Sequence, residues 1–378
     1  MTRASSYLDR RQLLAAVAAT AGVLPLNSAF AVEGQPVLMK LSGGGRGIAW
    51  PRPDAGLPHD LASQLVGISQ AHGHRALLVW HRGELLLEDY GADDSADTAM
   101  PGFSMAKTVL ALMYGAACDR GIISSLEEPV SVQIPEWRDD PRGKLTPRQL
   151  LQMRSGLKLY SLARGEPEAM IMASGTRATE TALATPLDSA PDSRFLYANV
   201  NSQIAGLYLS RAIMAHTGLT YAQALETWLL KPMGVGEINI EYEREGGHQR
   251  YFAGIHASPR NWLALALAVL IPREQGGAVS RNWLETLSAP SLHPQYGLHI
   301  WRGQAWQAQR HYGDPSGMTV PTLEPYIAED MLVLDGAGGQ RAYVSASRQL
   351  AIVRMGQPSW TWEDSALPNL VTRYLDQG

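Results

Sequence analysis

The chain has 378 residues, of which 45% are hydrophobic and 18% charged, and its formal net charge is −4. A chain of this length and apolar content can bury a large hydrophobic core. The weak charge, without a block of like-charged residues, argues against nucleic acid or an anionic membrane surface as a partner.

Residues 1–31 are predicted to be an export signal of the twin-arginine type. Arg10-Arg11-Gln12-Leu13-Leu14 opens an apolar, alanine-rich run, and Ala29-Phe30-Ala31 is a small-x-small cleavage site. An amphipathic helix or a general secretory signal is the alternative. We expect a periplasmic or secreted domain over residues 32–378. The longest later apolar run, Trp262 to Ile271, suits a buried helix and is too short to span a membrane.

The elements expected after this signal follow from hydrophobic patterns and turn residues. Residues 32–58 are rich in Gly and Pro and are expected to wrap the surface. The remaining expected elements are a helix over 61–70, a hairpin over 75–81 and 84–90, an apolar helix over 103–118, mostly helical structure over 119–260, strands over 331–335, 340–345 and 350–355, and a helix over 363–375. This order predicts an α+β fold in which both chain ends supply one antiparallel sheet, with an inserted helical lobe at about 106–250.

Ser104 and Lys107 are the main candidates for chemistry. Pro101-Gly102 precedes the apolar helix, so Ser104 falls in its first turn and Lys107 follows three residues later. Side chains at i and i+3 on a helix are neighbours. Lys107 is the only charged residue from Pro101 to Cys118, and burial lowers the pKa of an amine, which makes it available as a base. The helix start also favours an oxyanion. The alternative is a lysine that reaches solvent along the helix edge.

Ser104-Met105-Ala106-Lys107 resembles the first motif of the serine β-lactamases and penicillin-binding proteins. Tyr197-Ala198-Asn199 resembles the second motif of the class C enzymes and of related esterases and 6-aminohexanoate-dimer hydrolases. Other similar stretches are Leu145–Leu151, Arg154–Leu157, Tyr251–Ile255 and Tyr296–Trp301. The resemblance covers roughly residues 60–375. It implies a β-lactamase/transpeptidase-like fold, an antiparallel sheet flanked by helices with an all-helical lobe.

The resemblance also implies roles for the second motif. Tyr197 would share the proton transfers with Lys107, pass a proton to the leaving amine or alkoxide, and help to activate water. Asn199 would orient Lys107 or the substrate carbonyl. Lys107 and Tyr197 titrate as a coupled pair, so the sequence does not say which one is the base. An ordinary buried tyrosine is the alternative for Tyr197.

The third motif departs from the family pattern. Gly336-Ala337-Gly338-Gly339-Gln340 stands where the family usually has Lys-Thr-Gly or His-x-Gly. We expect Gly338, Gly339 and Gln340 to line the oxyanion site, with a backbone N–H of Gly339 or Gln340 as the second donor. Ala337 replaces the usual cation, which weakens the case for a β-lactam substrate. Arg341 has the same strand parity and is a candidate replacement that would bind an anionic substrate.

Other classes of protein fit less well. An α/β-hydrolase needs a buried strand before its serine, and residues 92–97 are polar. No His-Glu-x-x-His occurs, so neither a metal nor another cofactor is expected. The expected function is a serine hydrolase of a small amide, ester or peptide. A DD-peptidase or β-lactamase proper, or a non-catalytic binding or sensor module of the same fold, remains an alternative.

Overall fold

The computed structural model describes residues 36–45, 50–53, 56–244, 247–313 and 317–377. The predicted export signal lies outside these described residues. Within the described ranges, no helix is both long and apolar enough to cross a membrane.

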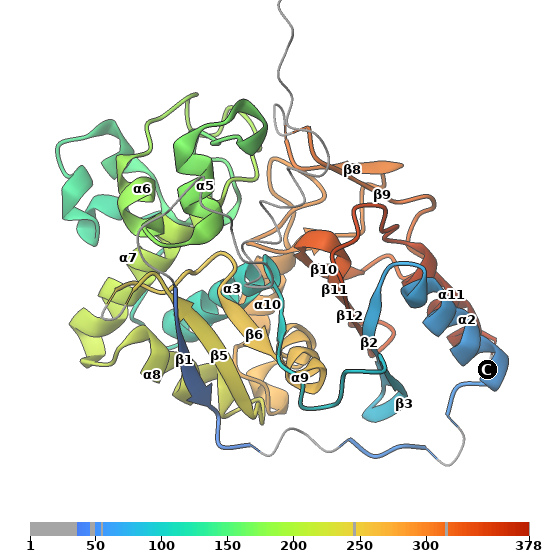
Figure 1. Ribbon diagram of the computed structural model, residues 1–378. Helices are drawn as coiled ribbons and strands as arrows, with labels where there is room; N and C mark the ends of the chain where they lie inside the picture. Colours follow the sequence, from blue (N-terminus) through green and yellow to red (C-terminus); the bar gives the residue numbers. More distant parts are fainter. Residues whose placement is uncertain (1–35, 46–49, 54–55, 245–246, 314–316, 378) are drawn as a thin grey trace, which may run out of the picture.

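A six-stranded antiparallel sheet with the order β3-β2-β12-β11-β10-β7 lies at the centre of the right-hand half of Figure 1. Its strands are β2 (His74–His81), β3 (Glu84–Tyr90), β7 (Trp301–Arg302), β10 (Leu332–Gly336), β11 (Gln340–Ser345) and β12 (Leu350–Gly356). β2 from the N-terminal part pairs directly with β12 from the C-terminal part, with Val79 opposite Ile352. The predicted hairpin, the three late strands and their union in one antiparallel sheet are therefore confirmed.

Helices cover both faces of this sheet because its strands are apolar on both faces. α2 (His59–Gln70) and α11 (Ala366–Leu375) lie together on one face, and α3 (Met105–Cys118) and α9 (Pro259–Leu270) pack on the other (Figure 1). Successive side chains of a strand point to opposite faces. Leu77 accordingly packs in the α2 and α11 core, and its neighbour Leu78 packs in the α3 and α9 core.

A second, four-stranded sheet with the order β1-β5-β6-β4 was not predicted. Its strands are β1 (Val37–Ser42), β4 (Met100–Pro101), β5 (Glu237–Tyr242) and β6 (Ile255–Ala257). β1 falls in the stretch that was expected to wrap the surface, and β5 falls in the range 119–260 that was expected to be mostly helical. Five of the six β1 residues are exposed. The strand therefore depends on pairing with the distant β5, and it has no alternating apolar pattern that would predict it.

The helical lobe occupies the left side of Figure 1, with α5 and α6 at the upper left and α8 below them. Its elements are η1 (Val130–Val132), η2 (Pro135–Trp137), η3 (Pro141–Lys144), α4 (Pro147–Leu151), η4 (Leu162–Arg164), α5 (Pro167–Ser174), α6 (Ala178–Ala184), α7 (Asn199–Thr217), α8 (Tyr221–Leu225) and the π-helical turn η5 (Glu226–Leu230). The remaining elements are η6 (Arg273–Gln275), α10 (Arg281–Ser288), the hairpin of β8 (Gln309–His311) and β9 (Thr319–Pro321), and η7 (Ala337–Gly339).

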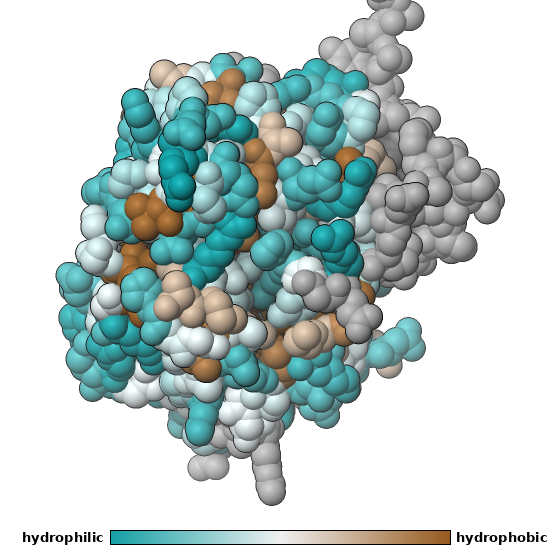
Figure 2. Space-filling model, turned by 90° about the vertical axis from the view of Figure 1, so that its left-hand side faces the viewer, coloured by the Kyte–Doolittle hydropathy of each residue, from teal (hydrophilic) through white to brown (hydrophobic). Residues whose placement is uncertain are grey.

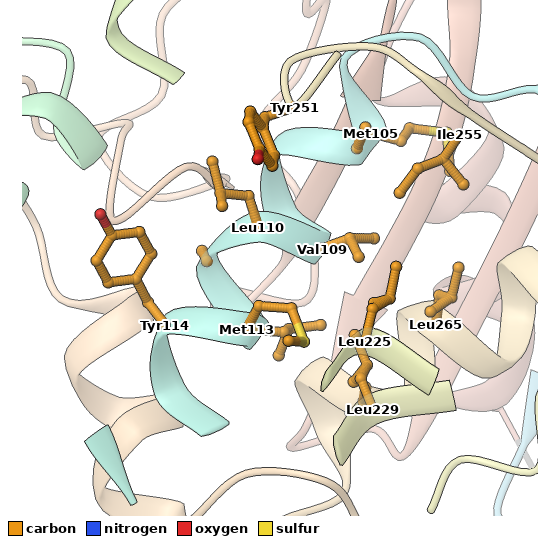
Figure 3. Close-up of a cluster of buried hydrophobic side chains, with 14 of the residues drawn as sticks. Met105, Val109, Leu110, Met113, Tyr114, Leu225, Leu229, Tyr251, Ile255 and Leu265 are labelled. Atoms are coloured by element: carbon orange, nitrogen blue, oxygen red, sulfur yellow. The ribbon is translucent and has the colours of Figure 1, made fainter. Parts of the chain in front are cut away.

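α3 is the central helix, and every residue from Met105 to Ala117 is buried. Figure 3 shows Met105, Val109 and Met113 along this helix, facing side chains of α8, η5, β6 and α9. A helix that is apolar all round is buried all round. The start of α3, where Ser104 stands, is therefore fixed by packing on several sides. On the face of the molecule that Figure 2 shows, apolar residues form small patches separated by polar ones.

Candidate active site

Ser104 is the N-cap residue of α3, one position before the helix begins. The turn that presents it is tight, because Phe103 has a positive φ of 47°, a conformation that is uncommon for a residue with a side chain. Gly102 precedes it, and a Cβ at Gly102 would overlap the indole ring of Trp262. The Gly102 N–H also donates to the Ile255 carbonyl at 3.0 Å. Gly102 and Phe103 thus form a tightly packed, strained turn that holds Ser104 at the start of the helix.

Lys107 is buried and has three oxygen partners. Its Nζ lies 2.8 Å from Ser104 Oγ and 2.9 Å from Asn199 Oδ1, and it donates to the Phe252 carbonyl at 3.0 Å. Burial lowers the pKa of Lys107 well below its ordinary value, Asp335 opposes this shift, and Arg250 adds to it. A neutral amine held by two fixed acceptors turns its lone pair to the remaining partner, which is the Ser104 hydroxyl.

Tyr197 lies beside the same pair. Its ring centroid is 4.8 Å from Lys107 Nζ. Burial raises the pKa of Tyr197 and Asp335 raises it further, while a hydrogen bond with Ser104 acts in the opposite direction. Lys107 and Tyr197, the two candidate general bases, therefore both contact Ser104, and burial favours the neutral form of each.

Three aromatic residues hold the Tyr197 ring. Trp301 stacks on it with a centroid distance of 5.8 Å, and Tyr312 and Tyr296 meet it edge-on at 5.1 and 6.0 Å. The Tyr197 N–H donates to the Tyr312 carbonyl at 2.9 Å. The position of the Tyr197 phenol is thus fixed by ring packing and by the hydrogen bond of the Tyr197 backbone. Sequence reasoning had pointed to the stretch Tyr296–Trp301 only by resemblance, and it did not identify Tyr312.

Asn199 is the first residue of α7, and its side-chain oxygen accepts from Lys107. The structure therefore places Asn199 as an orienting partner of Lys107, which is one of the two roles implied by the family resemblance. The backbone carbonyl of Phe252, the other fixed acceptor, was not identified from the sequence, because a backbone contact leaves no residue-type signal.

The glycine segment of the third motif lies beside the serine turn. A Cβ at Gly336 would overlap the carbonyl oxygen of Gly102, so the two backbones touch. Gly338 and Gly339 have positive φ values of 70° and 82°, which favours glycine at both positions. The Gln340 side chain is buried and exchanges two 2.9 Å hydrogen bonds with the Gly356 backbone. Gln340 therefore joins β11 to β12 through its side chain. Only a backbone group of this residue is left for the predicted oxyanion role, which stays a prediction for Gly338 and Gly339 as well.

The prediction that Arg341 binds an anionic substrate is wrong. Arg341 is 2% exposed, and its Nε donates to Asp364 Oδ1 at 2.7 Å while its Nη1 pairs with Asp335. Arg341 faces the core that α2 and α11 cover, where two carboxylates already hold the guanidinium, whereas Ala337, with which it was compared, lies in the turn η7 outside the strands.

A cavity of about 340 Å³ lies next to the second motif. Its lining carries both signs of charge and consists of Lys158, Leu159, Arg164, Glu166, Asp188 and Leu196. Leu196 immediately precedes Tyr197, so the cavity lies on the helical-lobe side of the candidate site. Among the described residues, no group of three or more His, Cys, Asp or Glu side chains could hold a metal ion. Cys118 is half-buried, and burial raises the pKa of its thiol to about 12, with Asp119 adding to the shift, so it is unsuited to act as a nucleophile.

The fold is of the β-lactamase and transpeptidase type, and the serine, lysine and tyrosine lie together within it. The family model for beta-lactamases matches residues 61–357, and the chain belongs to this family.

Solved structures with the same fold have varied chemistry. A protein assigned as a 6-aminohexanoate-dimer hydrolase from Bacillus anthracis is 15% identical with a TM-score of 0.67, and the match covers 90% of each chain. A D-stereospecific amidohydrolase from Streptomyces sp. is 17% identical with a TM-score of 0.57, covering 82% of this chain and 97% of that one. EstCE1, a hydrolase with promiscuous acyltransferase activity, is 15% identical with a TM-score of 0.61, covering 84% and 98%. No curated protein matches the sequence. At these identities the likeness establishes the fold alone.

Proposed function

We propose that this protein hydrolyses an amide or ester bond of a small molecule through an acyl-enzyme on Ser104. The observation that carries the proposal is the position of the buried Lys107 amine, 2.8 Å from Ser104 Oγ and held by Asn199 and the Phe252 carbonyl. A nucleophile, a base within hydrogen-bond reach and a group that orients the base form the arrangement that covalent acyl transfer needs. A binding module has no need for a desolvated amine at this distance.

The reaction would proceed in two halves. Ser104 Oγ bonds to the substrate carbonyl carbon while its proton passes to the Lys107 and Tyr197 pair. The carbonyl electrons move onto oxygen, and they return when the bond to the leaving amine or alkoxide breaks and that group takes the proton. Water then adds to the acyl-enzyme with help from the same pair. The second collapse releases the acid and restores the Ser104 hydroxyl.

Two observations favour linear amides and esters over β-lactams. Ala337 occupies the place of the cation that holds a β-lactam carboxylate in the family. Arg341, the nearest cation in the sequence after it, is buried against Asp335 and Asp364. The twin-arginine-like segment at residues 1–31 supports action after export, in the periplasm or outside the cell.

A substrate panel tests this proposal. The purified protein is assayed with nitrophenyl esters, 6-aminohexanoate dimer, peptides that end in D-Ala-D-Ala, and nitrocefin. The expected result is turnover of an ester or linear amide that Ser104→Ala abolishes. Preferred turnover of nitrocefin or of D-Ala-D-Ala peptides would instead indicate a β-lactamase or a DD-peptidase. Binding without turnover on the whole panel would indicate a non-catalytic module and would overturn the proposal.

A further inference from the structure

The carbonyl of Gly336 is held from inside the protein by a buried cation. Arg341 Nη1 donates to the Gly336 carbonyl at 2.7 Å and to the Gln340 carbonyl at 2.9 Å. Gly336 ends β10 and Gln340 begins β11, and the two residues face each other in the sheet register. One guanidinium therefore binds both ends of the glycine turn.

This bond fixes the direction of the next N–H group. The C=O and N–H groups of a trans peptide point in opposite directions, so a Gly336 carbonyl turned toward Arg341 turns the Ala337 N–H away from it. Arg341 lies on the sheet face that α2 and α11 cover, because Val333 and Tyr343, which share its parity, pack in that core. The opposite side of Gly336 touches the Gly102 carbonyl, two residues before Ser104. The Ala337 N–H therefore points to the side of the sheet on which the serine turn lies.

Arg341 is in turn held by a buried cluster of four charges, Arg310, Asp335, Arg341 and Asp364, all at most 6% exposed. Asp364 bridges the two arginines, with Oδ2 2.8 Å from Arg310 and Oδ1 2.7 Å from Arg341. Asp335 pairs with Arg341 and accepts a hydrogen bond from the Tyr312 hydroxyl. Burial alone would lower the pKa of Arg341, but Asp335 and Asp364 outweigh it and keep the pKa above its ordinary value. Buried charges of this kind are a weak source of stability, which suggests that the cluster serves to fix a geometry.

The same cluster reaches the catalytic tyrosine. Arg310 lies 4.4 Å from the centroid of the Trp301 ring, which stacks on Tyr197. Tyr312, the donor to Asp335, packs edge-on against the Tyr197 ring. The four charges thus support two parts of the site at once, the glycine turn through Arg341 and Tyr197 through Trp301 and Tyr312.

We propose that Arg341 is a positioning residue of the oxyanion site, which holds the Gly336–Ala337 peptide so that the Ala337 N–H serves with the Ser104 N–H as the pair of donors. The proposal rests on the proposed function of the Ser104 site. In this arrangement the second oxyanion donor is the backbone N–H of Ala337, and not that of Gly339 or Gln340 as was expected from the sequence. Arg341 would thus act on the site by binding a backbone carbonyl. The third motif itself has no cation, because Ala337 takes its place.

The first test removes the hydrogen bond from Arg341 to the Gly336 carbonyl without leaving a buried charge unpaired. The double variant Arg341→Gln/Asp364→Asn keeps the balance of the cluster, because Arg310 and Asp335 remain opposite charges 3.4 Å apart. The double variant Arg260→Gln/Glu88→Gln is the control. It removes another arginine–carboxylate pair, with bonds of 2.6 and 2.9 Å, and Arg52, which also binds Glu88, is largely exposed and needs no replacement partner. Each protein is assayed on the best substrate of the panel and with phenylboronic acid, whose tetrahedral Ser104 adduct places an oxygen in the oxyanion site.

The expected result is a roughly 10- to 100-fold fall in kcat with KM nearly unchanged, since an oxyanion donor acts in the transition state. The inhibition constant of phenylboronic acid should rise by a similar factor, and the control variant should match the wild type in both measurements. A folded Arg341→Gln/Asp364→Asn protein with wild-type kcat and wild-type boronate affinity would overturn the proposal. Because the wild-type protein is assayed in parallel, absence of turnover there would count against the proposed function and not against the role of Arg341.

A second variant keeps the test decisive if the cluster variant does not fold. Ala337→Pro deletes the N–H itself, and a proline fits there because Ala337 begins a 3₁₀ turn and Gly336 is extended, with φ −113° and ψ 147°. Ala337→Ser keeps the N–H and is its control. Ala337→Pro should lose about 100- to 1,000-fold in kcat, with a parallel loss of boronate affinity. Wild-type values for Ala337→Pro would show that the second donor lies elsewhere.

Discussion

The ε-amino nitrogen of Lys107 lies 2.8 Å from the hydroxyl oxygen of Ser104. The pair sits at the start of a helix whose residues from Met105 to Ala117 are all buried, so the amine is desolvated at the position where it can take the serine proton. This relationship determines both the chemistry and the stability that we expect of the protein.

Replacement of the lysine should separate activity from stability. Lys107→Met should reduce hydrolysis by roughly 100- to 10,000-fold, because the base is lost, while the protein folds at least as well as the wild type. The folded pKa of Lys107 is lowered, so the unfolded chain binds more protons above that pKa. The contribution of this group to stability therefore rises with pH until the amine is neutral in both states, near pH 10.5.

Urea unfolding at pH 6 and pH 9 measures this effect. The difference in unfolding free energy between Lys107→Met and the wild type should favour the variant more at pH 6 than at pH 9. A lysine that was charged in the folded protein would give no such pH dependence, and that outcome would contradict the assignment of Lys107 as a neutral base.

The pH profile of hydrolysis should respond to Arg250. This buried arginine lowers the pKa of Lys107, and it lies 5.0 Å from the ring centroid of Phe252, whose carbonyl binds the lysine. Arg250→Gln should therefore raise the pKa of Lys107 and move the acid limb of the kcat/KM profile to higher pH. Arg211→Gln, which removes an exposed ion pair with Glu136, is the control and should leave the limb in place. If the acid limb of the kcat/KM profile stays in place in both variants, a group other than Lys107 determines its pH.

Tyr197→Phe should reduce kcat by roughly 100-fold or more while thermal stability changes little, because the ring and its aromatic neighbours remain. Tyr208→Phe is the matched control. The Tyr208 hydroxyl donates to Glu128 at 2.6 Å, so that change should lower stability by about 1 kcal/mol and leave kcat unaffected. Steady-state kinetics and thermal unfolding of the two variants check this, and full activity of Tyr197→Phe would remove the tyrosine from the proton pathway.

Gly102→Ala should destabilise the protein by about 1–3 kcal/mol and impair activity, because a Cβ there overlaps the Trp262 ring. Gly67→Ala is the opposite case. Gly67 lies inside α2 with no atom within 4 Å of its added Cβ, so alanine should stabilise by about 0.5–1 kcal/mol. Chemical denaturation of both proteins tests the pair, and equal stabilities would contradict the close packing of the serine turn.

Much of this site could be predicted because its signals are local. Ser104 and Lys107 are neighbours on one helix, and the apolar pattern around them revealed the helix. The hairpin and the three late strands likewise had strong apolar runs bounded by turns. Tyr197 and Asn199 were identified only through family resemblance, since nothing within their own segment indicates that they meet Lys107.

What the sequence did not reveal depends on contacts between distant segments. β1 is largely exposed and exists through its pairing with β5. The ion pairs of Arg341 were not predicted, because its partner Asp364 lies in a loop, and Arg310, which binds the same carboxylate, lies in the short hairpin of β8 and β9. The strand parity of Arg341 predicted a substrate-binding cation, but parity does not show which face of the sheet the helices cover.

The central claim is that Ser104 is an activated nucleophile, and a fluorophosphonate probe tests it most directly. Attack by Ser104 Oγ forms an oxygen–phosphorus bond and expels fluoride, and the adduct is located by peptide mass mapping. We predict one label, on the peptide that carries Ser104, which is absent in Ser104→Ala and forms much more slowly in Lys107→Met. A wild-type protein that stays unlabelled, or a label that persists in Ser104→Ala, would contradict the account.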